Sequence, residues 1–224
     1  MTEKRVNFIL LNLALLPFVV LGLEIIVVLV ESLVYGNMDF NLWSFQAVIL
    51  HWVYTIIVWC TGLFLLCLLS KKIGYSIFAA KDKPKIKNWI IIGIILIITA
   101  IGSYIAWKMH FKPVLEYNGF INKYGSIGIV AFVFQYLYYV VESCLFLAIV
   151  VFGQEFGERV FKKIKIPWGG ILCGLTWGLG HIITQDLFTG FYAFFGAILY
   201  GVVYSQMQKN IKFAYIIIAI MFII

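Results

Sequence analysis

Apolar residues in this chain come in long runs that are separated by short polar or charged segments. The runs cover about 6–30, 43–69, 88–108, 127–153, 169–184, 188–207 and 211–224. A helix needs about 20 apolar residues to cross the hydrocarbon core of a bilayer, so the first four runs predict full membrane spans. The fifth and sixth runs are short and close together, which predicts a tight helical hairpin. The seventh has only 14 residues, so it predicts either a full or a partial span.

The composition places the chain in a membrane. Hydrophobic residues make up 63% of it, charged residues only 12%, and its mean hydropathy is +1.02. Soluble domains carry about 25% charged residues. We therefore predict an all-α, polytopic transmembrane helix bundle of about seven spans, formed by residues 1–224 as one membrane domain. The expected partner is the lipid bilayer, and the net charge of +7 indicates membrane topology rather than a nucleic-acid partner.

Lysine and arginine residues are distributed unevenly among the polar segments. With the N-terminus inside, the inside segments hold 14 of the 17, and the outside segments hold only Lys108, Lys112 and Lys123. Because cytoplasmic loops are rich in these residues, the pattern predicts an inside N-terminus and an outside loop at 108–126. The segment 71–87 interleaves six lysines with apolar residues, which predicts either a solvated cytoplasmic loop or an interfacial segment on anionic lipid.

Two ionisable residues lie deep inside apolar runs, Glu142 in the fourth and His181 in the fifth. A buried charge in hydrocarbon costs several kcal/mol or more unless it is paired, ligated or protonated. Gln135, Tyr139 and Phe146 share a helical face with Glu142, and this polar stripe must face protein or water. Each of the two residues is either a hydrogen-bonded packing group or part of a functional site.

Both residues are predicted to lie at one depth. Glu142 is 11 residues from the inner end near Gly153, and His181 is 12 residues from Gly169. At a rise of 1.5 Å per residue, each lies roughly 16–18 Å above the inner surface. Because consecutive spans tend to be neighbours, we expect the two side chains to line one cavity within about 8 Å of each other, directly or through water. Such a pair could hydrogen-bond, hold a water or bind a divalent metal, with His51 near the same level as a possible third ligand.

Other residues have structural explanations. Gly170, Gly174 and Gly178 follow one another at intervals of four, which lets a neighbouring helix approach closely. Asp186 is expected to cap or end a helix. The remaining acidic residues are weaker candidates, with a solvated helix end explaining the last two: Glu24, Glu31, Glu155 and Glu158.

The order and spacing of these residues resemble the CAAX protease and bacteriocin-processing (CPBP or Abi) family of intramembrane proteases. Segment 142–147 falls where that family has an EExxxR motif, with Glu142 matching one glutamate, and segment 177–181 matches an FxxxH motif with Trp177 for phenylalanine. The resemblance covers about 127–224. The chain departs from the family because Val141 or Ser143 replaces the partner glutamate, Phe146 or Leu147 replaces the arginine, and 213–224 lacks the late histidine.

The resemblance implies roles for the two buried residues. In the family, glutamate activates water and histidine positions it or shapes an oxyanion site, so Glu142 and His181 are the implied catalytic residues. The implied function is that of an intramembrane endopeptidase with incomplete motifs, either weakly active or a pseudoenzyme that binds a peptide or protein partner in the membrane cavity. The expected location is the plasma membrane of a prokaryote. The alternative is a non-catalytic membrane protein, such as a bacteriocin-immunity factor, an assembly partner or a small transporter subunit.

Overall fold

The computed structural model describes residues 2–72, 74–75 and 82–224. Within these ranges the chain is all-helical, which confirms the predicted fold class. The segment 71–87, predicted as a solvated loop or an interfacial segment, lies partly outside the described residues, at 73 and 76–81. The elements in chain order are α1 (Glu3–Tyr35), η1 (Phe40–Leu42), α2 (Phe45–Lys72), α3 (Ile86–Ala106), α4 (Lys112–Tyr124), η2 (Gly125–Ile127), α5 (Gly128–Phe161), α6 (Trp168–Cys173), the π-helical turn η3 (Gly174–Gly178), α7 (Leu179–Thr184), α8 (Leu187–Gln206) and α9 (Ile211–Ile223).

Five helical stretches are long and apolar enough to cross a membrane. They are α1, α2, α3, the run Lys112–Phe161 that ends with α5, and α8. α9 is apolar but has only 13 residues. Large apolar side chains point outward from these helices, and α3 exposes one such stripe: Ile90, Ile94, Ile97, Ile101 and Ile105. Exposed apolar stripes of this length fit a lipid environment, so the chain is an integral membrane protein.

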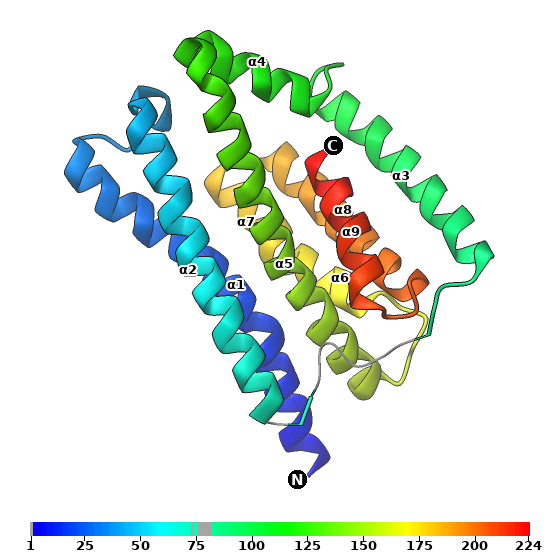
Figure 1. Cartoon of the computed structure of the whole chain (residues 1–224). Coiled ribbons are helices and arrows are strands. Elements are labelled where there is room, and N and C mark those ends of the chain that lie inside the picture. The colour runs from blue at the N-terminus through cyan, green and yellow to red at the C-terminus, as the bar shows by residue number, and fades with distance from the viewer. Residues whose placement is uncertain (1, 73, 76–81) are drawn as a thin grey trace.

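α5 is the central helix of the bundle. In the stretch that ends with α5, 61% of the residues in an apolar 18-residue segment are buried. The corresponding fraction in the other four stretches is 17–39%. α1 and α2 pack along one side of α5. The segment formed by α6, η3 and α7, called here the α6–α7 arm, packs along the other side together with α8 and α9 (Figure 1). α3 lies at the edge, against α8 and α9. A helix that is surrounded by protein can carry polar side chains that a lipid-facing helix cannot.

The fifth apolar run is not one regular helix. It forms α6, the π-helical turn η3 and α7, and π-turns of this kind often occur at functional sites. The predicted close approach of a neighbouring helix is confirmed, and the neighbour is α8. A Cβ on Gly178 would lie 2.7 Å from the Cα of Phe194, and a Cβ on Gly170 would lie 2.7 Å from the carbonyl oxygen of Ala197. Asp186 caps α8 as expected, and the side-chain hydrogen bond from Thr189 holds the pKa of Asp186 below its usual range.

The segment predicted as an outside loop contains the 13-residue helix α4. Its Glu116 carboxylate accepts hydrogen bonds from the hydroxyls of Tyr136 (2.9 Å) and Tyr139 (2.7 Å) of α5. Its first residue, Lys112, is buried, donates to the carbonyl of Phe222 in α9 at 2.9 Å and lies over the rings of Tyr139 and Phe222. α4 therefore ties α5 to α9 at one end of the bundle (Figure 1).

Candidate functional site

Glu142 lies on α5 and faces the α6–α7 arm. Its side chain is buried, with 7% of the residue exposed. The indole Nε1–H of Trp177 donates a hydrogen bond to Glu142 Oε1 at 3.1 Å. A hydrogen bond that is made to an ionised group is stronger than a neutral one, so Trp177 stabilises the carboxylate where lipid cannot.

His181 lies one turn beyond Trp177. Its Nδ1 is 2.9 Å from the carbonyl oxygen of Trp177, and the two ring centroids are 4.8 Å apart in an edge-to-face arrangement. A carbonyl oxygen only accepts, so Nδ1 carries the hydrogen of this bond. In the neutral imidazole the lone pair is therefore on Nε2. The bond fixes both the tautomer and the direction in which His181 can accept a proton.

Aromatic side chains from three helices hold Trp177 in place. The Phe146 ring of α5 lies 4.9 Å from it, the Phe222 ring of α9 lies 5.8 Å away, and the Tyr200 ring of α8 stacks on Phe146 at 5.2 Å. Ring centroids at these separations give favourable aromatic contacts. The indole is therefore a fixed link between Glu142 and His181 rather than a mobile surface group.

The structure thus brings the two predicted site residues to one residue, Trp177: Glu142 accepts from its indole N–H, and His181 contacts its ring and its backbone carbonyl. The link that it describes between Glu142 and His181 is the indole, and their lining of one cavity stays a prediction. Within the described ranges, no group of three or more His, Cys, Asp or Glu side chains is arranged to hold a metal ion. Glu142 and His181 alone supply two donors with an indole between them, which is a poor fit to a divalent metal.

His51 joins a different cluster. Its Nδ1 is 2.7 Å from Glu31 Oε2, and its Nε2 is 3.4 Å from Glu24 Oε1, so it lies against α1 rather than supplying a ligand beside His181. Tyr138 of α5 donates to Glu24 Oε1 at 2.8 Å. Glu24 and Glu31 were weaker candidates in the sequence. Their spacing of seven residues, which places both on one helical face, is the signal that could have identified them.

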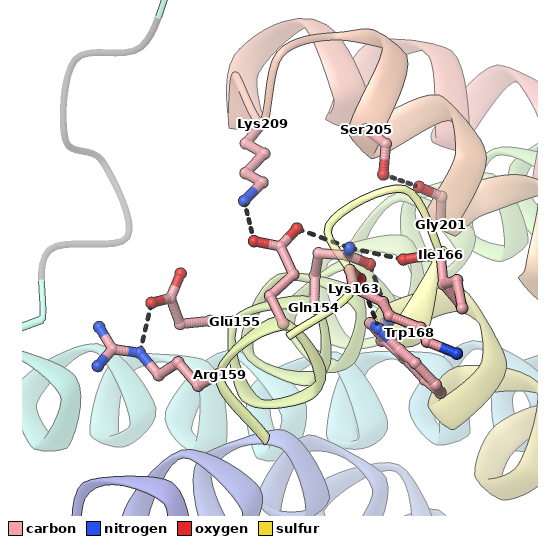
Figure 2. A network of polar contacts seen from close by, with 11 residues as sticks. Gln154, Glu155, Arg159, Lys163, Ile166, Trp168, Gly201, Ser205 and Lys209 are labelled. Atoms are coloured by element: carbon pink, nitrogen blue, oxygen red, sulfur yellow. Dashed lines mark hydrogen bonds and ion pairs between the residues drawn. The ribbon is translucent and has the colours of Figure 1, made fainter. Parts of the chain in front are cut away.

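A second polar network joins α5 to the start of α6 and to the α8–α9 turn (Figure 2). Gln154 is 1% exposed, and its amide nitrogen donates to Glu158 and to the carbonyl of Ile166, both at 2.9 Å. Its amide oxygen accepts from the backbone N–H of Gly169 at 3.0 Å. Glu158 also pairs with Lys209 at 2.5 Å, and its side chain is 12% exposed. The solvated helix end predicted for Glu158 is therefore wrong, because its carboxylate holds two segments together.

In comparisons with known proteins, no family model, no curated protein and no solved structure matches this chain. The likeness to the CAAX protease family rests on the motifs in the sequence alone. The site must be judged by what its own groups can do. It offers a buried carboxylate, an indole donor and an imidazole of fixed tautomer in an apolar setting.

Proposed function

We propose that this chain is a CAAX-protease-like intramembrane endopeptidase with incomplete catalytic motifs, in which Glu142 is the general base. The observation that supports the proposal is the convergence of Glu142 and His181 on Trp177. Ionisable residues inside membrane proteins are rare and usually functional. The missing second glutamate, arginine and late histidine make the proposed peptidase a slow one.

The proposed mechanism follows from the hydrogen bonds. Trp177 engages one oxygen of Glu142, so the other oxygen, Oε2, takes a proton from the attacking water. The hydroxide forms a bond to the peptide carbonyl carbon as the C=O π bond opens to an oxyanion. The C=O bond then re-forms as the C–N bond breaks, and Glu142 delivers its proton to the leaving amine nitrogen. Because Nδ1 of His181 is held by a carbonyl, Nε2 of the neutral ring accepts from the water and orients it.

The second candidate is a non-catalytic membrane protein, such as an immunity factor, an assembly partner or a small transporter subunit. The observation that favours it is also at Trp177. The indole contacts both proposed catalytic residues, and its hydrogen bond satisfies Glu142 in the way that a structural packing contact would. In this reading the cluster holds α5 against the α6–α7 arm and carries no chemistry.

Two substitutions distinguish the peptidase from the non-catalytic protein. The rate of cleavage of a quenched-fluorescence peptide library is measured with purified protein reconstituted into liposomes. General-base catalysis supplies roughly 10²–10⁴-fold in rate, so Glu142→Gln should abolish measurable cleavage. Trp177→Phe removes the indole hydrogen bond that stabilises the Glu142 carboxylate, so cleavage should fall without being abolished. The unfolding midpoint of each variant serves as the control for folding. Cleavage by Glu142→Gln at the parental rate would eliminate the catalytic role, and no cleavage by parent or Trp177→Phe would leave the non-catalytic function.

We also propose a topology of about seven spans with the N-terminus inside, in the plasma membrane of a prokaryote, and a peptide or protein partner in the membrane cavity. The uneven distribution of lysine and arginine supports this orientation. The alternating direction of successive helices along the bundle supports counting the α6–α7 arm and α9 as spans (Figure 1).

A further inference from the structure

A buried histidine lies between two glutamates where α1, α2 and α5 meet. His51 of α2 is 4% exposed and Glu31 of α1 is 5% exposed. The two ring nitrogens of His51 face different carboxylates, with Nδ1 2.7 Å from Glu31 Oε2 and Nε2 3.4 Å from Glu24 Oε1. The hydroxyl of Tyr138 of α5 donates to the same oxygen of Glu24. No step of the proposed function uses these groups.

The hydrogen-bond chemistry of this cluster requires bound protons. A neutral imidazole has one donor nitrogen and one acceptor nitrogen, and an ionised carboxylate only accepts. A neutral His51 would therefore face one carboxylate with a lone pair. An imidazolium donates from both nitrogens and satisfies both carboxylates. The short Nδ1 contact with Glu31 is a hydrogen bond, and the longer Nε2 contact with Glu24, at 3.4 Å, is an ion-pair distance, so an imidazolium suits both sides of the ring.

The charge balance leads to the same result. Two ionised glutamates beside a neutral histidine would leave a charge of −2 at the cluster, one carboxylate of which, Glu31, is buried while the side chain of Glu24 is 30% exposed. Among the described side chains no lysine or arginine forms an ion pair with Glu24 or Glu31. The titratable groups that face the cluster from the other packed elements are Tyr35 of α1, which is neutral near pH 7, and Tyr138 and Glu142 of α5, of which Tyr138 is also neutral near pH 7. A charge on Glu142 would repel the carboxylate of Glu24 and would therefore add to the need for a positive charge on His51. Glu31 Oε1 is buried without a hydrogen-bond partner, which adds to the cost of leaving its charge uncompensated.

We propose that Glu24, His51 and Glu31 form a buried proton-binding site, in which His51 is held as an imidazolium that bridges the two carboxylates of α1. The bound proton joins α2 to α1, and the Tyr138 hydrogen bond extends the link to α5. Loss of the proton places a lone pair against a carboxylate and weakens the contact between the helices. The site shares no residue with Glu142 and His181, so its test is separate from that of the proposed peptidase function.

Nitrogen NMR of the full-length protein, labelled with ¹⁵N-histidine and held in lipid nanodiscs, tests this directly. The chain has three histidines, so His110→Gln and His181→Gln variants assign the His51 signals by elimination. The expected result at pH 7.5 is that both ring nitrogens of His51 are protonated. A neutral His51 ring at this pH would overturn the proposal.

The pH dependence of folding gives a second readout. The folded state holds the His51 proton more tightly than the unfolded chain does, so its stabilisation is complete at low pH and is lost as the pH rises through the titration of the folded ring. Relative to His51→Gln, the unfolding equilibrium constant of the parent should increase by up to about tenfold per pH unit in that range. The matched variant His110→Gln should keep the parental dependence. An identical pH dependence in the parent and His51→Gln would contradict the proposal.

Discussion

Three buried polar side chains, Glu142, Gln154 and His51, each bind a partner on another segment of the bundle. Their partners are the indole of Trp177, the backbone of Ile166 and Gly169, and two glutamates of α1. A polar group in an apolar interior is costly when it is unpaired. Each pair therefore specifies which helices are neighbours, at positions where the surrounding apolar residues would tolerate several arrangements.

A buried polar residue can be recognised from the sequence when its polarity differs from that of the apolar stretch around it. Glu142 and His181 interrupt long apolar stretches, so their importance follows from composition and the cost of burial. Trp177 looks like an ordinary apolar residue, and its role as their link depends on the direction of one indole N–H. Gln154 lies near a helix end, where a polar residue is usually solvated, and only the packing of 166–169 against it shows that it is buried.

At the scale of elements, hydropathy predicted the long helices well, because a membrane demands length and continuous apolarity. The helix α4 was not predicted, since its mixed sequence lacks the length and apolarity of a span. The π-helical turn η3 was also missed, because the glycines that predict close packing do not reveal the local helix type. The hairpin of the fifth and sixth runs was predicted from their short spacing, and the packing of α6, η3 and α7 on α8 confirms it.

The packing of the α6–α7 arm on α8 predicts unequal effects of two glycine substitutions. Gly178→Ala would place a methyl group 2.7–2.8 Å from backbone atoms of Phe194, so we expect destabilisation of about 1–3 kcal/mol. Gly196→Ala, on α8 but with no atom within 4 Å of the added Cβ, should be neutral or stabilising. Unfolding of both variants in lipid micelles measures the difference. Equal stability of the two variants would show that the arm does not pack as described.

At the scale of the molecule, the bundle is built around α5, and its interior polar clusters lie along that helix. The proposed inside position of the N-terminus predicts which surface segments a membrane-impermeant thiol reagent reaches in sealed vesicles. Asn118→Cys, exposed on α4, should be labelled only from outside, and Lys163→Cys, exposed after α5, only from inside. The parent chain, whose cysteines all lie within helices, gives the background. Labelling of position 118 only from the cytoplasmic side would reverse the topology.

The central claim is that α5 and the α6–α7 arm meet through the hydrogen bond between Glu142 and Trp177, since both candidate functions depend on it. A double-mutant cycle measures this contact directly, from the free energies of unfolding of the parent, Glu142→Leu, Trp177→Phe and the double variant in lipid micelles. The control cycle pairs Glu142→Leu with Trp89→Phe, because Trp89 lies on the peripheral helix α3. We predict a coupling energy of about 0.6–3 kcal/mol for Glu142 with Trp177 and additivity for the control. Additive effects in both cycles would contradict the account.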